Sequence, residues 1–527
     1  MNAFEKHAVL LASGILLITS LRIAATYRVF SFTIDEPCHF ACGLEYLSKH
    51  VYRYETQHPP LARAMIALGP YLAGVRPLGG PERNTEGRAV ILRSRRPERT
   101  LSLMRLGVLP FYWMAIWAIF LWSRHYFGAA VAVVAVAVFS LLPPVLAHAG
   151  LATTDMAVTG CLASAFFALA LWAESPGWRR GILLGIALAL AVLSKFTALL
   201  YLPSAAAIAL LFYSIAVKPS LSNVAASLRE RAPSFVLAIV CAAFAIWAGY
   251  FFSYGRVPGW NLRLPAPEFF DGILAARSHN IDGHPAFLLG NVSSKGWWYY
   301  FPVALGVKTP IPFLILAALG AYVCAKNFSA SGYRLVLAYV LGILASAMLM
   351  GHIDIGVRLI LPIYVGLSIL AALGTEWLSR ARLVGLAAAA VLLLWMAVSG
   401  VLSHPDYLSY FNAIAGRQPA NVLVDSDLDW GQDTKRLARR LRDLNVQSVS
   451  LMLLEPLAQP LPVEDDLRRY YGLPPIQAVN FTSPPEGWTV ISPTAARTLA
   501  LPFKPWYELI PPTEKVGELW LYHITER

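Results

Sequence analysis

Long apolar stretches recur along the chain until about residue 401 and then stop. Each approaches the roughly 20 residues that a helix needs to cross a hydrocarbon core of about 30 Å. The first, residues 8–27, is too long for a signal-peptide core and lacks a convincing small-residue cleavage site, so we interpret it as a retained helix. The pattern predicts about eleven membrane spans. They lie near residues 8–27, 103–122, 129–148, 156–173, 181–194, 197–216, 234–252, 301–325, 335–350, 359–378 and 383–401.

Basic residues are concentrated in alternate short loops between these spans, and the positive-inside rule assigns such loops to the cytoplasm. An odd number of spans then places the N-terminus inside and the chain after the last span outside. The cytoplasmic loops contain Lys6, Arg124, Arg179, Arg180, Lys218, Arg229, Arg231, Lys326, Arg334, Arg380 and Arg382.

Three segments on the expected external side, residues 28–102, 253–300 and 402–527, are too long to be simple connections. Irregular segments near a membrane surface persist where they line a cavity or bind a ligand. Within the first, residues 58–73 are amphipathic, with Arg63 beside an apolar stripe, which is typical of a helix lying in the interface plane. The stripe consists of Leu61, Met65, Leu68 and Leu72.

The last segment changes character and contains more charges and prolines. Residues 432–443 have a helical pattern, residues 446–453 alternate as a strand does, and the Pro-rich residues 456–462 indicate a loop. The expected organisation is an all-α polytopic membrane domain followed by a small external α/β domain. Their ranges are 1–401 and 402–527.

The composition agrees with a membrane protein, because 57% of the 527 residues are apolar and only 14% are charged. The formal net charge of +12 would suit nucleic acid. The basic residues are nevertheless spread over membrane loops, and no nucleic-acid-binding module is recognisable. We therefore expect anionic lipid and lipid phosphate as partners, and no nucleic acid. Cys38 and Cys42 bracket His39, which is an incomplete set of zinc ligands.

Asp35 and Glu36 follow the first span directly and precede Pro37. Adjacent carboxylates serve as general bases, as metal ligands or as acceptors for sugar hydroxyls, but acids before proline also begin helices. Asp155 follows Thr153 and Thr154 at the same membrane face. Like the acid pair, it is either a functional carboxylate or the start of a helix. Ionisable residues at membrane depth by default mark a functional site.

Basic and imidazole side chains gather on this face as well. A lipid phosphate requires fixed positive charge near the interface, which Arg and Lys supply. Each of these residues can also simply extend toward the interface, and Arg358 can pair with Asp354. The aromatic run 296–302 is either an interfacial belt or a platform for carbohydrate or isoprenoid. The gathered side chains are His58, Arg105, Lys195, Lys308 and Arg358.

Taken in order, these motifs resemble the GT-C glycosyltransferases, in the family that holds protein O-mannosyltransferases and lipid A aminoarabinose transferases. The chain departs from bacterial relatives at Leu359, where His is frequent, and at Arg417, where Gly is usual. The residues that carry the resemblance are Asp35-Glu36 with His39-Phe40, His58-Pro59-Pro60-Leu61, Asp155, Leu193-Ser194-Lys195-Phe196, Gly296 through Pro310, Arg358 with Leu361-Pro362, and the tail segments 403–412 and 425–433.

The resemblance implies inverting transfer of a sugar from a polyprenyl-phosphate donor to an acceptor on protein, lipid or glycan. Asp35 would be the general base, and Glu36 and Asp155 would orient the acceptor. Asp35 and Asp155 are also the candidate ligands of a divalent metal ion. Lipid phosphate would be neutralised by Arg105, Lys308 or Arg358. The further substrate-binding candidates are His39, His58, Arg63 and Lys195.

The resemblance also implies a bacterial inner membrane, with the active site and the C-terminal domain facing the periplasm. The competing hypothesis is a transporter or flippase for a lipid-linked sugar, which needs the same spans and the same phosphate site. No repeated half and no matching pair of broken helices is evident in the sequence to support it.

Overall fold

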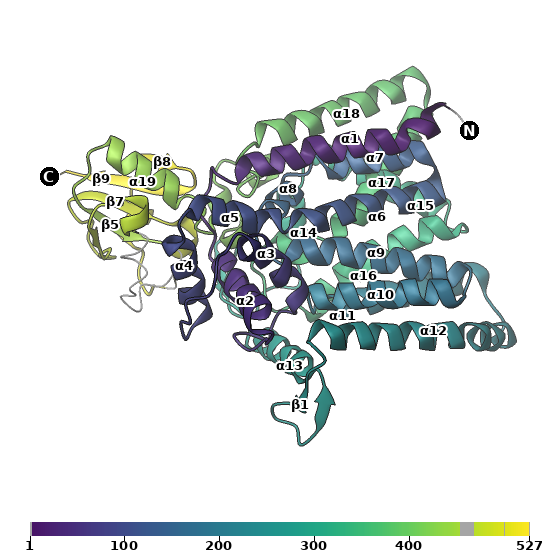
Figure 1. Ribbon diagram of the computed structural model, residues 1–527. Coiled ribbons are helices and arrows are strands. Elements are labelled where there is room, and N and C mark those ends of the chain that lie inside the picture. The colour runs from purple at the N-terminus through teal and green to yellow at the C-terminus, as the bar shows by residue number, and fades with distance from the viewer. Residues whose placement is uncertain (1–2, 454–467, 500, 526–527) are drawn as a thin grey trace.

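The computed structural model describes residues 3–453, 468–499 and 501–525. A helical bundle forms one part of the molecule, and the segments between and after its helices are gathered at one end of it (Figure 1). The bundle consists of α1 (Ala3–Thr26), α6 (Leu109–Phe127), α7 (Ala129–Phe139), α8 (Pro143–Ala149), α9 (Asp155–Glu174), α10 (Trp178–Ser194), α11 (Ala198–Val217), α12 (Leu221–Gly249), α14 (Tyr300–Lys308), α15 (Ile311–Lys326), α16 (Ser331–Met350), α17 (Ile363–Ser379) and α18 (Arg382–Leu402).

Seven stretches of described helix are long and apolar enough to cross a membrane, and up to nine if each of two bent pairs is one span. The bent pairs are α7 with α8, at 72°, and α14 with α15, at 119°. The other two expected spans, near 181–194 and 359–378, correspond to α10 and α17, which have 17 residues each. At 1.5 Å per residue, 17 residues cover only about 25 Å.

Burial separates central from peripheral helices. In α9, 78% of the apolar window is buried, whereas the figure for α12 is 11%. Large apolar side chains on peripheral helices, such as Leu17, Leu210, Val236 and Leu394, are exposed in the chain alone. In a membrane protein these faces meet lipid.

Close approach between central helices depends on glycine. Gly320 of α15 lies against the backbone of α17, where a Cβ would overlap the Leu370 carbonyl oxygen. Gly374 of α17 meets the Leu316 carbonyl of α15 in the same way. These two glycines bring the two helices into backbone contact.

The three long segments of the sequence lie at the same end of the bundle (Figure 1). The apolar stripe of the expected interfacial helix is only partly buried, and its Leu72 is exposed, whereas Arg63 on the other face is fully buried. The elements of the first two segments are α2 (Asp35–Lys49), α3 (Pro60–Leu72), α4 (Arg83–Arg93), α5 (Pro97–Leu106), β1 (Tyr254–Arg256), β2 (Arg263–Pro265), α13 (Pro267–Asp282), β3 (Ala286–Leu288) and β4 (Asn291–Ser293).

The chain after α18 has two parts. Residues 403–433 pack into the core of the helical body, to which Tyr407, Leu423 and Trp430 belong. The small α/β domain begins only at helix α19 (Thr434–Asp443). The border predicted at residue 402 therefore groups residues 403–433 with that domain, although they also pack with the membrane domain. This segment contains the 3-10 turns η2 (Ala413–Ala415), η3 (Pro419–Asn421) and η4 (Asp425–Asp427).

The α/β domain contains a five-stranded sheet in the order β6-β5-β7-β9-β8. Strand β5 is parallel to β6 and β7, and β9 is antiparallel to β7 and β8. Helix α19 packs Leu437 and Leu441 on the face that includes Val490, and Ile491 faces the other side with Trp506. The Pro-rich residues 456–462 lie outside the described residues. The elements are α19 (Thr434–Asp443), β5 (Val449–Met452), β6 (Ile476–Gln477), β7 (Gly487–Ile491), α21 (Pro493–Thr498), η5 (Trp506–Glu508), β8 (Glu514–Val516) and β9 (Leu519–Ile524).

Candidate active site

The two adjacent acids occupy the first turn of α2, where carboxylates are favourable to the helix dipole. Their side chains diverge, because successive helical positions point about 100° apart. Asp35 faces a cavity with 34% of its side chain exposed, whereas Glu36 points into the protein and is 0% exposed. The pair therefore divides into one accessible and one buried carboxylate.

Glu36 is fully engaged inside the protein. Its oxygens accept hydrogen bonds from the backbone N–H groups of Thr33 and Ala152, each at 2.8 Å. They also accept hydrogen bonds from Nε and Nη2 of Arg105, each at 2.8 Å. Glu36 thus ties the start of α2 to the chain before α9.

Arg105 uses its remaining donors on backbone carbonyls. Nη1 donates to Tyr27 at 3.0 Å and to Phe30 at 3.4 Å, and Nη2 donates to Ser31 at 2.8 Å. The guanidinium is buried, and all five N–H groups have protein acceptors. The expectation that Arg105 binds the donor phosphate is wrong in this structure, because the side chain has no free donor.

Arg358 lies between the two remaining carboxylates. Its Nη1 is 2.8 Å from Asp35 Oδ2 and 3.8 Å from Asp155 Oδ2. Asp155 begins α9 and accepts Lys195 Nζ on Oδ1 at 2.6 Å. The structure therefore brings together four residues that are distant in sequence, and Arg358 pairs with Asp35, not with Asp354. Because Asp155 is fully buried, it positions the two cations and does not itself reach the cavity.

The tail segment covers the other side of this ion pair. The guanidinium carbon of Arg358 lies 4.1 Å from the centre of the Trp430 ring, a cation–π contact. The Trp430 carbonyl accepts the N–H of Ile34, the residue before Asp35, at 3.2 Å. The Asp427 carboxylate accepts the N–H of the residue before Arg358 at 3.1 Å. One segment thus holds the backbone on both sides of the Asp35–Arg358 pair.

Lys308 belongs to this support and does not line the cavity. Its Nζ donates to the carbonyl oxygens of Leu408 at 2.7 Å and Asp427 at 2.5 Å, and the ammonium lies over Phe411. A buried ammonium held in this way fixes the tail segment to α14. The predicted role of Lys308 in phosphate binding does not agree with this position.

The predicted residues around α3 form a second buried group. Arg63 donates from Nε to His39 Nδ1 at 3.1 Å and from Nη1 to the Tyr52 hydroxyl at 2.8 Å, and Nη2 contacts Glu55. Arg63 and His39 are buried and anchor the start of α3, so neither is free to bind substrate. His58 lines the cavity. Burial lowers the pKa of His58, which makes it a neutral hydrogen-bonding group and not a cation.

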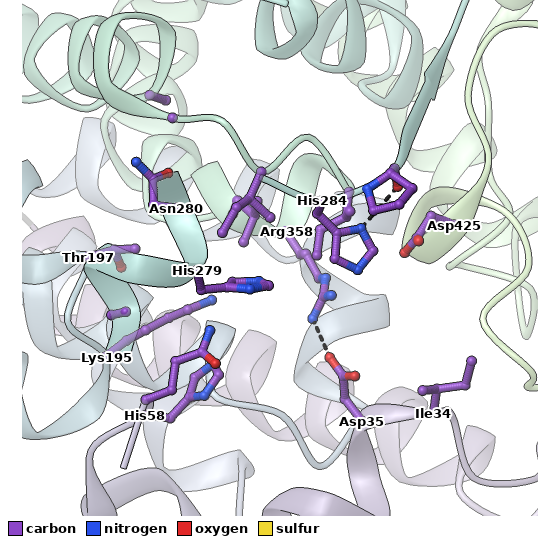
Figure 2. Close-up of a pocket in the computed structure, with 18 of the residues that line it drawn as sticks. Ile34, Asp35, His58, Lys195, Thr197, His279, Asn280, His284, Arg358 and Asp425 are labelled. Atoms are coloured by element: carbon purple, nitrogen blue, oxygen red, sulfur yellow. Dashed lines mark hydrogen bonds and ion pairs between the residues drawn. The ribbon is translucent and has the colours of Figure 1, made fainter. Parts of the chain in front are cut away.

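The cavity has a volume of about 1200 Å³. It extends from the bundle to α13 and to the C-terminal domain. Figure 2 shows Asp35 joined to Arg358 in the middle, Lys195 and His58 on one side and Asp425 on the other. Of the aromatic run 296–302, only Phe301 lines it.

Most of the cavity residues were not predicted as site residues, among them Arg83, Asp425 and Trp430. Arg83, at the start of α4, lines the cavity, and its Nε has no hydrogen-bond partner within the part of the chain that the structure describes. No motif in the sequence marks it. Asp425 and Trp430 lie in the tail segment 425–433, whose run of four acids beside Trp and Gln carried the resemblance without an assigned role. That motif was the only sequence signal that could have identified Asp425 and Trp430 as site residues.

The predicted metal ligands do not fit a shared divalent ion. The position between Asp35 and Asp155 is held by Arg358, and Lys195 supplies a second positive charge. In the described ranges, one group of three potential ligands lies within reach of one ion, and it consists of Cys38, Cys42 and Glu55. Arg63 already contacts that Glu55 carboxylate.

Comparisons with known proteins agree with this architecture. Residues 100–250 match the family model of dolichyl-phosphate-mannose-protein mannosyltransferase. Two crystal structures of ArnT from Cupriavidus metallidurans, one bound to undecaprenyl phosphate and one in the apo state, match with a TM-score of 0.52 and 13% identity, over 96% of this chain and 96% of ArnT. A comparison with curated protein sequences found no match.

A weaker likeness is to the archaeal oligosaccharyltransferase AglB from Archaeoglobus fulgidus, in complex with an inhibitory peptide and a dolichol-phosphate. It has a TM-score of 0.48 and 14% identity, over 95% of this chain and 62% of AglB. The family domain and the ArnT-like fold confirm the predicted resemblance and the GT-C fold. The chain is an integral membrane protein with the fold of ArnT.

Proposed function

We propose that this chain transfers a sugar, with inversion, from a polyprenyl-phosphate donor to an acceptor hydroxyl at the external face of the membrane. The observation that carries the proposal is the Asp35 carboxylate, which opens into a large cavity that Lys195 and Arg83 also line. The reaction needs a base near the acceptor and positive charge near the departing phosphate.

Asp35 has the geometry of a general base. One oxygen, Oδ2, is held by Arg358, and Oδ1 has no partner among the residues that the structure describes. In the reaction, Oδ1 takes the acceptor proton while the acceptor oxygen bonds to the anomeric carbon. The bond from that carbon to the phosphate oxygen breaks on the opposite side, and the lipid phosphate leaves with the electron pair.

Lys195 and Arg83 are the proposed contacts of the departing phosphate, and His58 is a neutral hydrogen-bonding group beside them. Arg is suited to bidentate phosphate contacts and Lys to a point charge. Asp155 orients Lys195 and Arg358 and touches no substrate. The donor class is supported by the dolichyl-phosphate-mannose family domain over 100–250.

We infer the orientation from the distribution of charge. Basic loops occur between the spans at the end of the bundle away from the cavity, which the positive-inside rule assigns to the cytoplasm. We therefore place the cavity and the C-terminal domain in the periplasm of a cell with an inner membrane. The acceptor belongs to protein, lipid or glycan.

The deciding experiment measures transfer from radiolabelled undecaprenyl-phosphate mannose by purified protein in proteoliposomes, with cell-envelope extract as the acceptor source. Asp35→Asn keeps the shape of the side chain and removes the base, so transfer should fall by about 100-fold or more. Asp282→Asn, at an exposed acid at the end of α13, is the control and should remain within about twofold of wild type, as surface substitutions usually do. Activity of Asp35→Asn within a few-fold of wild type would refute the base assignment.

The same assay tests for a metal. Because Arg358 and Lys195 balance the two carboxylates, transfer should persist in excess EDTA. Loss of transfer in EDTA with recovery on adding Mg²⁺ or Mn²⁺ would require a divalent ion. Absence of transfer, together with movement of the lipid-linked sugar across intact vesicles, would favour the transporter hypothesis.

A further inference from the structure

The cavity continues beyond Asp35 onto the C-terminal domain. Its far wall is apolar and comes from separate parts of that domain, near the end of β5, before β7 and after α21. Leu499 is exposed, and the other side chains of the wall are partly or fully buried. The wall consists of Met452, Leu453, Phe481 and Leu499. A domain that only stabilised the fold would not need to extend the active-site cavity with apolar side chains.

Asp425 lines the same cavity as this wall and the Asp35–Arg358 pair. Its backbone has a φ of 59°, in the left-handed region that non-glycine residues rarely adopt. The Thr494 hydroxyl of α21 accepts the Asp425 N–H at 2.9 Å and so holds this conformation. Strained backbone of this kind persists where the surroundings fix it, and it is frequent at binding sites.

The two ends of the cavity differ in charge. Lys195 lines one end, and the Asp425 carboxylate with His284 beside it lines the other, with Asp35 and Arg358 between them (Figure 2). Arg83 also lines the cavity. Burial raises the pKa of Asp425 to about 6, which leaves it largely ionised at neutral pH. A phosphate is attracted to the first end and repelled from the second, so the second end is the one available to the acceptor.

We propose that Asp425 and the apolar wall form the acceptor subsite, and that it takes a neutral glycoside with an apolar aglycone. Sugar hydroxyls donate to the Asp425 carboxylate, and the aglycone packs on Phe481 and its neighbours. The assignment rests on the proposed function, because it identifies the acceptor of that reaction. An acceptor with an anionic sugar is disfavoured at Asp425.

Three soluble probes separate the two contacts. Phenyl β-glucoside has both the neutral sugar and the apolar ring, methyl β-glucoside lacks the ring, and phenyl β-glucuronide adds a negative charge. Binding to the full chain in nanodiscs is measured by calorimetry without donor. Phenyl β-glucoside should bind about tenfold more tightly than methyl β-glucoside, as expected for one well-packed ring, and several-fold more tightly than the glucuronide.

Each variant should remove one preference. Phe481→Ala should abolish the preference for phenyl over methyl glucoside, and Asp425→Asn should abolish the preference for glucoside over glucuronide. Two matched controls, Phe503→Ala and Asp443→Asn, change exposed residues of the same domain that do not line the cavity, and they should keep both preferences. Thermal unfolding of every variant checks that it is folded.

Two results would overturn the subsite. One is the absence of measurable binding of phenyl β-glucoside to the wild-type chain, and the other is preferences that both variants retain. Because binding is measured without donor, absence of both preferences in the wild-type chain, with sugar transfer intact, rejects only the subsite. Failure of the Asp35→Asn prediction, by contrast, rejects the proposed chemistry and leaves the binding preferences as they are.

Discussion

At the scale of single residues, the adjacent acids show how burial decides a role that sequence leaves open. The structure directs Asp35 to the cavity and Glu36 to Arg105. Which of two neighbours on a helix faces a cavity depends on how tertiary packing rotates that helix, and the local sequence does not contain this information. The same limit applies to Arg105 and Arg63. The sequence shows their charge, but it does not show the buried groups that accept their hydrogen bonds.

The Glu36–Arg105 pair makes a strong stability prediction. Glu36→Gln leaves a buried guanidinium without its counter-ion, which typically costs about 3–5 kcal/mol in unfolding free energy. Denaturant unfolding in mild detergent measures the change. Glu376→Gln, which breaks the exposed pair with Arg380 at 2.6 Å, is the control and should cost less than about 1 kcal/mol. Equal effects of the two substitutions would contradict the structural role of Glu36.

Asp433 should make the stability of the fold depend on pH. Burial raises its pKa to about 7 despite the nearby Arg436. A carboxyl whose pKa is higher folded than unfolded stabilises the fold below its unfolded pKa near 4, and this stabilisation is lost as the pH rises through about 7. The melting temperature of wild type should therefore fall between pH 5 and pH 8 by more than that of Asp433→Asn. Parallel curves for the two proteins would exclude the effect.

At the scale of elements, the apolar pattern predicted where the helices lie, but it did not predict which of them are bent or too short to cross the membrane alone. Each predicted span corresponds to a helix or a bent pair, because a run of about 20 apolar residues has few alternatives in a membrane. The bends at α7–α8 and α14–α15 lie next to prolines, Pro143 and Pro310, which identify a break but not its angle. The tail border is hard to predict for a similar reason. Residues 403–433 contain polar motifs that resemble a soluble domain yet pack on the bundle.

The contact between α15 and α17 provides the prediction for this scale. Gly320→Ala inserts a methyl group into the backbone of α17, and overpacking of this kind typically costs about 1–3 kcal/mol. The loss should appear as a lower melting temperature. Gly14→Ala in α1, where a Cβ meets nothing within 4 Å, is the matched control and should be neutral or slightly stabilising. A neutral Gly320→Ala would mean that the two helices are farther apart than described.

At the scale of the whole molecule, the segment 425–433 joins the C-terminal domain to the Asp35–Arg358 pair. Ser492 and Thr494 of the domain hold Asp429, through its carboxylate and its carbonyl respectively, and Trp430 of the same segment covers Arg358. The sequence indicated that the tail matters, through its resemblance, but not that it returns to the Asp35–Arg358 pair. A contact between segments this far apart in the chain leaves no periodic pattern of apolar residues in the sequence.

Trp430 tests this connection. Trp430→Leu removes a cation–π contact worth about 1–2 kcal/mol when desolvated, so the sugar-transfer rate should fall roughly tenfold. Trp430→Phe keeps an aromatic face and should recover most of that rate, which a role in bulk packing alone does not predict. Trp488→Leu, in the sheet and away from the cavity, is the control. Equal rates for the Leu and Phe variants would argue against the cation–π role.

The return of the tail to the Asp35–Arg358 pair has a consequence for biogenesis. Asp35 leaves the ribosome almost 400 residues before Trp430, and the last span, α18, must be inserted before residues 425–433 can cross to the same side. On the proposed orientation, a chain that is arrested or cleaved before export of its tail has an incomplete site. On the proposed function, the site that surrounds the Asp35–Arg358 pair is therefore complete only after the tail has been translocated.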